Sequence, residues 1–529
     1  MSPPLSRGGR SRAARSVAVA LIYGSFALAL SALDASAANR HTAASHVGAA
    51  SAPSARIRPQ AGRARGKEGR ESRRSVASKA FARHRHSKDR ARDRGLRRPD
   101  RQAHPPPSPH FDAHYLASLP HRMQRMPEGQ PPPGSVPGQI LVLLDQDRPR
   151  SLGRELARTY GLERIGSEPI ALLGARAELM AVRRDRLDAV LAALRRDPRV
   201  RSAQPNQRYL HMGATEQPRA RMVEAGLPSA PDGDRQHLDA AIPQYGPRKL
   251  GLPAAHDLAL GRNVLIAVID SAIDTEHPEL AGGIARSFNA AGRADARLDY
   301  HGTAVAGLIR GHGLVEGAAP QSELLAVRAF KTNDETTFQE TTTDVLIRAV
   351  DWAVRNGARV LNMSFVGAHD SALQQVLRTA GDKGVIVIAA AGNGGPAAPP
   401  AYPAAYPGVI AVTAVDEADR RYEHANRGSY IAVAAPGVDV LAPVERGGYA
   451  YVSGTSFAAA YVSGIAALLL ERDPNLDPRS VADLLATAAE HLGPNVRDDD
   501  FGAGRVDAYK ALKLLVNARA AKRGDLARP

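Results

Sequence analysis

Four polar residues stand where a folded chain could use them for chemistry: Asp270, His301, Asn393 and Ser456. Asp270 and Asn393 each follow directly on an apolar run that predicts a buried strand. His301 immediately precedes a predicted helix, and Ser456 opens another. A serine at a helix start has its hydroxyl near the positive end of the peptide dipoles, where it can cap the helix or act as a nucleophile. Singly, such residues are more often turn formers or caps, so a site exists only if the fold brings them together.

The elements that must position these residues are predicted by apolar runs and by helical spacing between them. The runs are continuous rather than alternating, which suits strands covered on both faces. They cover 264–269, 324–327, 360–363, 385–391, 409–415 and 431–435. The predicted helices cover 303–310, 344–356, 373–383, 456–471, 480–488 and 507–516. This alternation predicts an α/β fold with a mostly parallel sheet and helices on both faces, whose ligands bind outside the carboxyl ends of the strands.

A smaller folded unit is predicted before this sheet, at about 138–209. Strands are expected at 140–144, 170–173, 177–182 and 200–209, and helices at 152–160 and 187–195. The order β-α-β-β-α-β fits a small α+β ferredoxin-like sandwich.

The charge of the chain is concentrated near its N-terminus. The 529 residues carry a formal net charge of +16, but residues 40–109 alone hold 19 Lys and Arg against 5 Asp and Glu. Residues 110–529 are close to neutral, so no specific nucleic-acid binding is expected of the folded body. Cysteine is absent, which excludes disulfides, thiolate metal sites and a cysteine nucleophile.

The first 37 residues have the pattern of a secretory signal peptide. Four arginines precede an apolar run over 17–33, and Ala35-Ser36-Ala37 follows it. The alternative is an uncleaved membrane anchor, but the run is shorter than the ~20 residues that span a bilayer. Residues 38–135 lack apolar periodicity and are expected to form a disordered basic and proline-rich linker. Weak binding of an anionic surface by residues 40–109 is the alternative to a merely solvated linker.

The motifs around the four polar residues resemble those of the subtilisin-like serine peptidases, the subtilase family. Asp270-Ser271-Ala272-Ile273-Asp274 resembles their aspartate motif, and His301-Gly302-Thr303 resembles their histidine motif. Ala390-Ala391-Gly392-Asn393 is similar to the oxyanion-asparagine segment, and Gly454-Thr455-Ser456 to the nucleophile segment. The chain order Asp, His, Asn, Ser is that of the family and differs from the order in chymotrypsin-like enzymes. The likeness spans about 235–515.

The resemblance implies peptide-bond hydrolysis by an Asp-His-Ser triad through an acyl-enzyme. His301 would take the proton of Ser456 and return it to the leaving amine. Asp270 would hold the imidazole in one tautomer and stabilise its positive charge. The side-chain amide of Asn393 and the backbone N–H of Ser456 would stabilise the oxyanion.

The resemblance also implies where substrate binds. Ser364-Phe365-Val366 would be the cleft strand that pairs with the substrate backbone. Ala390-Ala391-Gly392 would line the primary specificity pocket, and these small residues predict a roomy apolar slot. Four departures from the family pattern bear on pocket shape rather than on the catalytic groups: Ala272, Tyr300, Val366 and the pair Ala460-Tyr461.

The small N-terminal unit is similar to the pro-regions of the same family, which fold in this way and occupy the cleft until they are cleaved. The expected domains are a signal peptide (1–37), a linker (38–135), a pro-domain (136–211), a linker with the maturation site (212–234), a catalytic domain (235–516) and a basic tail (517–529). The alternative for residues 136–211 is a permanent accessory domain.

Together these features predict an exported, monomeric serine endopeptidase made as a self-cleaving zymogen. Its partners would be protein or peptide substrates and its own pro-domain, acting as an inhibitor. Two alternatives are a catalytically silent peptide-binding relative and a surface-adhesion protein that acts through its basic arm. No cofactor is expected. Relatives often bind calcium, but Asp498-Asp499-Asp500, the densest acidic cluster, is interpreted as a polar loop.

Overall fold

The computed structural model describes residues 134–211, 221–222, 244–292, 298–332 and 339–523. All of them fall within one compact unit of the chain. The predicted signal peptide, almost all of the basic linker and the predicted maturation segment other than residues 221–222 lie outside the described residues. No helix in the described part of the chain is long and apolar enough to cross a bilayer.

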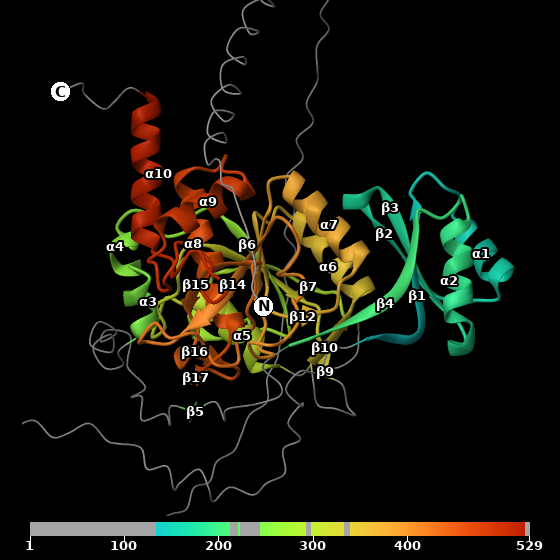
Figure 1. Ribbon diagram of the computed structural model, residues 1–529, viewed down its shortest axis with the longest axis horizontal. Helices are drawn as coiled ribbons and strands as arrows, with labels where there is room; N and C mark the ends of the chain where they lie inside the picture. The colour runs from blue at the N-terminus through green and yellow to red at the C-terminus, as the bar shows by residue number, and fades with distance from the viewer. Residues whose placement is uncertain (1–133, 212–220, 223–243, 293–297, 333–338, 524–529) are drawn as a thin grey trace, which may run out of the picture. The chain divides into compact units, whose positions relative to one another are not determined.

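The described chain opens with an antiparallel sheet and two helices (Figure 1). Its elements are β1 (Ser135–Asp145), α1 (Leu152–Tyr160), β2 (Glu163–Ile170), β3 (Ala175–Ala181), η3 (Arg184–Arg186), α2 (Leu187–Arg196) and β4 (Ser202–Leu210). The strand order β2-β3-β1-β4 is that of the predicted ferredoxin-like sandwich. Ile140 and Val142 pack under the two helices, whereas Leu141 and Leu143 on the opposite face join the core of the larger domain.

One expected strand of this unit is wrong. Residues 171–173 form a short 3₁₀ helix, η2 (Ala171–Leu173), and the strand β2 precedes them. Most of β2 is polar and exposed at the sheet edge, so its sequence has no apolar run. The apolar 170–173 stretch instead buries Leu172 and Leu173 against the larger domain.

The larger domain is built on seven parallel strands in the order β15-β14-β13-β11-β6-β8-β7. They are β6 (Leu265–Asp270), β7 (Ile284–Asn289), β8 (Glu323–Arg328), β11 (Val360–Met363), β13 (Ile386–Ala390), β14 (Val409–Val415) and β15 (Ile431–Pro436). Six of the seven coincide with the predicted apolar runs. The exception, β7, lies at the sheet edge and is mostly exposed, so no apolar run marks it.

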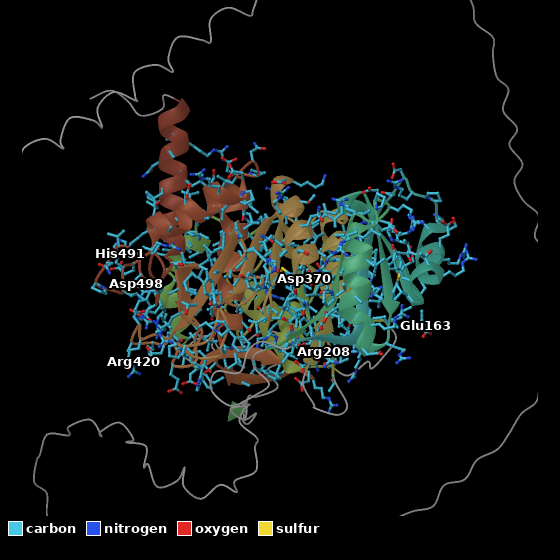
Figure 2. The ribbon with its side chains drawn as sticks, turned by 45° about the vertical axis from the view of Figure 1, so that its right-hand side comes forward. Glu163, Arg208, Asp370, Arg420, His491 and Asp498 are labelled. Carbon is cyan, nitrogen blue, oxygen red and sulfur yellow. The ribbon has the colours of Figure 1, made fainter. Side chains whose placement is uncertain are left out.

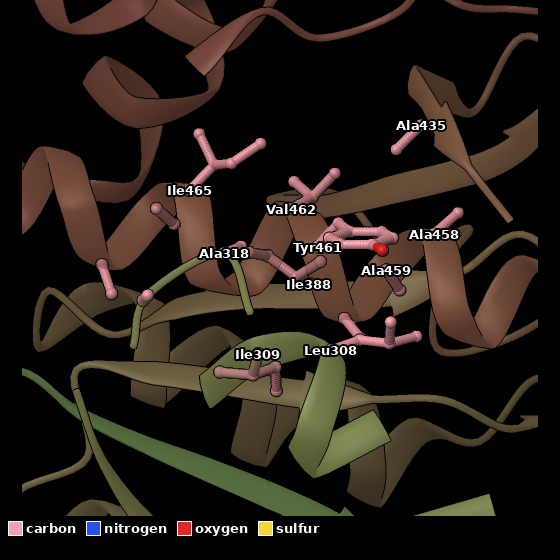
Figure 3. Packing of buried hydrophobic residues seen from close by; sticks show 14 of the residues in the cluster. Leu308, Ile309, Ala318, Ile388, Ala435, Ala458, Ala459, Tyr461, Val462 and Ile465 are labelled. Carbon is pink, nitrogen blue, oxygen red and sulfur yellow. The ribbon is translucent and has the colours of Figure 1, made fainter. Parts of the chain in front are cut away.

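Both faces of this sheet are covered, as the continuous apolar runs predict. Along β6, Ile266 and Val268 face one core cluster, and Ala267 and Ile269 face the other. Figure 3 shows side chains of α8 on the first face, packed around Ile388. The helices are α3 (Tyr245–Lys249), α4 (Leu252–His256), η5 (Pro278–Leu280), α5 (Tyr300–Arg310), α6 (Thr343–Arg355), α7 (Ser371–Asp382), α8 (Thr455–Arg472), α9 (Pro478–Ala488) and α10 (Ala508–Arg523).

Two helix boundaries differ from the sequence expectation by three residues or more. His301 lies in the first turn of α5 rather than before it, because Asp299 caps the helix by accepting a hydrogen bond from the backbone N–H of His301 at 2.9 Å. The last helix, α10, continues to Arg523, beyond the expected end at 516.

Short strands complete the fold and join its two parts. β5 (Arg221–Met222), β16 (Val440–Val444) and β17 (Gly448–Val452) form a separate three-stranded sheet. The others are β9 (Lys331–Thr332), β10 (Gln339–Thr342) and β12 (Val366–Gly367). The end of β4 runs antiparallel between β10 and β12, so the small N-terminal unit extends one strand into the larger domain (Figure 1).

Candidate active site

The predicted aspartate and histidine meet at the carboxyl end of β6. Asp270 is the last residue of this strand, and its Oδ1 lies 2.8 Å from Nδ1 of His301 on α5. The same oxygen accepts a hydrogen bond from the backbone N–H of Ser271 at 2.7 Å. Both side chains are buried, with exposed fractions of 0% for Asp270 and 2% for His301. The carboxylate therefore fixes the orientation of the imidazole and directs its Nε2 away from Asp270.

Charge and burial act against one another at this pair. Burial alone opposes the charged imidazole, but the adjacent carboxylate and its hydrogen bond outweigh it and raise the pKa of His301. Burial likewise opposes the charged carboxylate, but the neighbouring imidazoles and hydrogen bonds keep the pKa of Asp270 below its ordinary value. An ionised aspartate beside a histidine that readily accepts a proton is the arrangement that general-base catalysis requires.

The predicted nucleophile lies in the first turn of α8, against the loop after β11. Ser456 is 3% exposed, and its hydroxyl donates a hydrogen bond to the carbonyl oxygen of Ser364 at 3.3 Å. Ser364 in turn donates from its hydroxyl to the carbonyl oxygen of Ser456 at 3.1 Å and accepts from Asn362 at 2.9 Å. Ser364 is predicted from the sequence as part of the substrate strand. In the structure its hydroxyl and carbonyl groups hold the first turn of α8 in place.

His301 and the start of α8 are neighbours. The ring centroids of His301 and Phe457, the residue after Ser456, are 5.5 Å apart. His301 Nε2 is buried and has no hydrogen-bond partner among the described residues. The serine hydroxyl thus points to Ser364 rather than to the imidazole, and a rotation about its Cα–Cβ bond is needed to pair them.

The side-chain amide of Asn393 is fixed beside the same helix start. Its Oδ1 accepts hydrogen bonds from the backbone N–H of Thr455 at 3.0 Å and from the hydroxyl of Thr455 at 2.8 Å. With its oxygen held in this way, the Nδ2 end lies near Gly454. The amide is therefore positioned as a donor next to the backbone N–H groups of the α8 N-terminus.

The segment predicted to line the primary pocket follows β13. Ala390 ends this strand, and the carbonyl oxygen of Ala391 accepts a hydrogen bond from Tyr430 at 2.9 Å. Gly392 has φ +110° and would place any Cβ 2.8 Å from the amide of Asn426. Glycine is thus required at position 392 by its backbone conformation and by the close approach of Asn426.

The predicted substrate strand is paired with β4 of the N-terminal unit. Of the three residues expected there, only Val366 belongs to a strand, β12, where it lies opposite Leu210. Phe365 is fully buried beneath, with its ring 5.9 Å from that of Tyr209 and nearly perpendicular to it.

A histidine that sequence reasoning missed lies against the catalytic candidates. His211 follows β4, and its ring is stacked between His301, at 4.3 Å, and Phe330, at 3.8 Å. Its Nε2 is 3.5 Å from Asp270 Oδ1. Burial lowers the pKa of His211 to about 3, more than the nearby Asp270 carboxylate raises it. The sequence around it, Gln207-Arg208-Tyr209-Leu210-His211, has no apolar alternation that would have marked this histidine as buried.

His211, Asp270 and His301 could be considered as metal ligands, since their ligand atoms lie within 4.8 Å of one another. Histidine and aspartate are a donor set that zinc uses. The two imidazole planes, however, are inclined by only 24° and are stacked. Lone pairs in nearly parallel, stacked planes do not converge on one ion, so we assign no metal to this cluster.

The acidic cluster at 498–500 forms a turn. Asp498 accepts hydrogen bonds from the backbone N–H groups of Asp500 and Phe501, at 2.9 Å and 2.8 Å. Asp500 pairs with Arg421 at 2.9 Å and with Arg427 at 2.6 Å. The two arginines thus balance the negative charge of Asp500.

A parallel sheet covered by helices, with a buried aspartate–histidine pair at its carboxyl edge and a serine at a helix start, has the features of a serine hydrolase with a subtilisin-like order of the three residues. Residues 261–504 match the model of the subtilase family, peptidase S8. Thermitase from Thermoactinomyces vulgaris is 33% identical over 279 residues, which cover 51% of this chain and 96% of thermitase. Subtilisin from Bacillus pumilus is 36% identical over 277 residues, which cover 50% of this chain and 98% of that subtilisin.

A solved structure agrees with these sequence matches. The crystal structure of fervidolysin from Fervidobacterium pennivorans superposes with a TM-score of 0.59 at 25% identity, covering 72% of this chain and 61% of fervidolysin. The chain belongs to the subtilase family and is a subtilisin-like serine endopeptidase.

Proposed function

We propose that Asp270, His301 and Ser456 form the catalytic triad of this endopeptidase and that Asn393 contributes to its oxyanion hole. The observation that carries this proposal is the 2.8 Å contact between Asp270 Oδ1 and His301 Nδ1, which leaves Nε2 of the same ring buried and unpaired beside the α8 N-terminus. Catalytic hydrogen bonds are often absent before substrate is productively bound, so the hydrogen bond of Ser456 to the Ser364 carbonyl is compatible with this role.

The reaction follows from these positions. Ser456 turns from Ser364 to His301, gives its proton to Nε2, and attacks the substrate carbonyl carbon. Asp270 stabilises the imidazolium that forms. The oxyanion receives hydrogen bonds from the Asn393 amide and the Ser456 backbone N–H, and each such donor contributes about 3 kcal/mol to transition-state stabilisation. His301 then protonates the leaving amine, and water hydrolyses the acyl-enzyme by the same steps in reverse order.

We also propose that the chain is exported and is made as a zymogen. The basic and apolar pattern of residues 1–37 supports export. The pairing of β4 with β10 and β12, with His211 against His301, supports an inhibitory pro-domain, because an extended segment in this place excludes a substrate from it. The pro-domain accordingly comprises residues 136–211, and the maturation site follows in 212–234.

The experiment compares the full chain with its Ser456→Ala variant after identical expression and purification. The wild-type chain is expected to shorten by loss of its N-terminal region and then to digest casein. The variant is expected to remain full length and inactive, with an unchanged circular dichroism spectrum. Ser453→Ala is a matched control, since Ser453 is a partly exposed serine three residues away whose hydroxyl bonds only Asp439 among the described residues, and it should mature normally. Normal maturation of the Ser456→Ala chain in the absence of other proteases would refute the assigned nucleophile.

A further inference from the structure

The strand that fills the cleft places alternate side chains into the larger domain. In the register of β4 against β12, Leu210 lies opposite Val366 and Tyr209 opposite Gly367. Tyr209 and His211 are both buried, with exposed fractions of 0% and 4%, whereas Leu210 between them is partly exposed. This is the alternation of an extended strand, and it means that the cleft surrounds every second side chain.

His211 occupies a flat slot with an aromatic wall on each side. Its ring lies 4.3 Å from that of His301 and 3.8 Å from that of Phe330, with an interplanar angle of 24° in both cases. The backbone N–H of His211 donates to the carbonyl oxygen of Gln339 at 3.3 Å, which fixes the depth of the residue in the slot. A slot with two parallel ring walls accepts a planar ring and leaves a branched aliphatic side chain poorly packed.

Tyr209 occupies a second pocket, formed on the other side of Phe365. The Phe365 ring meets the Tyr209 ring edge-on at 5.9 Å. A Cβ on Gly367 would lie 2.3 Å from Tyr209 Cδ1, so the pocket exists only because residue 367 has no side chain. Phe330 and Phe365 are themselves in contact, at 5.1 Å, and therefore form one aromatic wall shared by both pockets.

We propose that this endopeptidase selects peptides in which a tyrosine and a histidine, separated by one unselected residue, directly precede the region that is cleaved. The proposal rests on the proposed function, since it requires that a substrate follow the path of β4. Phe330 and Gly367 are the residues that determine this specificity: Phe330 closes the histidine slot, and Gly367 leaves room for the tyrosine ring.

The test uses the processed wild-type enzyme and internally quenched peptides that copy residues 205–218 of the chain. Replacing the tyrosine by alanine is expected to lower kcat/KM about 30-fold, because a large aromatic contact area is lost. Replacing the histidine by alanine is expected to lower it about tenfold, through loss of two ring contacts. Replacing the leucine between them by alanine should change it less than about threefold, since this position is only partly covered.

Enzyme variants then assign each preference to its pocket. In Phe330→Leu, the ratio of kcat/KM for the parent peptide to that for the peptide with alanine in place of histidine should fall toward one. In Gly367→Ala, the ratio of kcat/KM for the parent peptide to that for the peptide with alanine in place of tyrosine should fall. Phe288→Leu is the matched control, because Phe288 is an aromatic residue on β7 that stacks on Trp352, and it should keep both ratios.

Two failures are distinguishable. If the processed chain digests neither casein nor any peptide, the proposed function is wrong and the specificity proposal falls with it. If casein is digested but the alanine peptides are cut as fast as the parent, or the leucine replacement matters as much as the other two, only the specificity proposal is overturned.

Discussion

At the scale of single residues, the site depends on one carboxylate that is kept ionised in a buried place. Asp270 has no exposed surface, yet its Oδ1 receives hydrogen bonds from His301 and from the Ser271 backbone. A buried charge persists only when such donors replace its lost hydration. The same donors make the carboxylate a rigid support for the imidazole.

The pH dependence of activity follows from the pKa of His301. The general base acts only when neutral, so activity is present above this pKa and is lost as pH falls through it. Because Asp270 raises the pKa of His301 against the effect of burial, the acid limb of kcat/KM should lie above pH 6.5, the ordinary pKa of histidine. The measurement is kcat/KM of the processed enzyme between pH 5 and 10. A midpoint well below pH 6.5 would contradict the coupling to Asp270.

Replacing the carboxylate tests its role directly. Asp270→Asn removes the charge and favours the wrong imidazole tautomer, so kcat should fall by about three to four powers of ten. Asp299→Asn is the matched control, because it removes a nearby carboxylate but leaves a residue that still caps α5. It should lower kcat less than about tenfold, since Asp299 bonds His301 only through the backbone N–H. That N–H and the Ser271 hydroxyl share Oδ1 and can still donate to the asparagine oxygen, so only the contact of Gln339 with Oδ2 is lost. Equal losses in the two variants, measured by steady-state kinetics, would show that net charge alone matters.

Part of this site could be predicted from the sequence, because the signals that mark it lie in short stretches of neighbouring residues. Asp270, His301, Asn393 and Ser456 each lie at an element boundary that apolar patterns mark. His211 and Phe330 could not be predicted, since their roles arise from stacking between segments more than a hundred residues apart. No local pattern encodes such a contact.

At the scale of elements, the loop after α5 is held by an internal anion. Glu279, 1% exposed, accepts hydrogen bonds from four consecutive backbone N–H groups, those of residues 312–315, at 2.6 to 3.1 Å. The hydroxyl of Tyr449 donates to the same carboxylate at 2.9 Å. The carboxylate thus organises a loop that directly follows the helix carrying His301.

Removing this carboxylate should destabilise the domain. Glu279→Ala leaves four donors without an acceptor, and the expected loss in free energy of unfolding is about 3 kcal/mol. For a domain of this size that corresponds to a fall in Tm of about 6–12 °C. The neighbouring exposed residue provides the control, Glu276→Ala, which should change the stability by less than about 0.5 kcal/mol. Differential scanning calorimetry of the inactive Ser456→Ala chain avoids self-digestion, and equal Tm values for the two variants would contradict the assigned role.

Elements with a strong local pattern could be predicted, and those without one could not. The strand β11 and the helix α1 coincide with their predicted ranges. The strand β2 is polar at an edge, and β10 and β12 are only four and two residues long and pair with distant parts of the chain, β4 among them. For such segments the decisive hydrogen bonds come from distant parts of the chain.

At the scale of the whole described unit, the N-terminal domain is held by more than its last strand. Asn206 donates to Asp344 at 2.8 Å at the start of α6, and Gln204 accepts from the backbone N–H of Ala372 at 3.1 Å at the start of α7. Asp370, labelled in Figure 2, is the N-cap of α7 and accepts a hydrogen bond from the backbone N–H of Leu373 at 2.9 Å. β4 therefore contacts the first turns of two helices of the larger domain before it pairs with β10 and β12. If residues 136–211 are released as a pro-domain, as proposed above, the release must break both kinds of contact.

This release should depend on the protonation of His211. Between β10 and β12 the ring of His211 faces His301, Phe330 and the Asp270 carboxylate. The backbone N–H of His211 donates a hydrogen bond to the backbone carbonyl oxygen of Gln339. Burial lowers the pKa of His211 to about 3, whereas a solvent-exposed histidine has a pKa of about 6.5. A proton therefore binds His211 more tightly in the released form than in the bound form. The binding of the N-terminal unit to the larger domain is thus strongest above pH 6.5 and weakens as pH falls toward 3.

The expected effect is a rise in the release rate of up to about tenfold for each pH unit below 6.5. The measurement holds the processed, still associated enzyme at pH 7.5 or 5.5 for increasing times and then assays it at pH 8, so that titration of His301 does not enter. His211→Phe keeps a planar ring in the slot but cannot be protonated, and its release rate should be nearly the same at both pH values. If this variant responds to acid as strongly as the wild type, the pH dependence arises elsewhere in the contact between the two domains, and the stacked histidines do not control it.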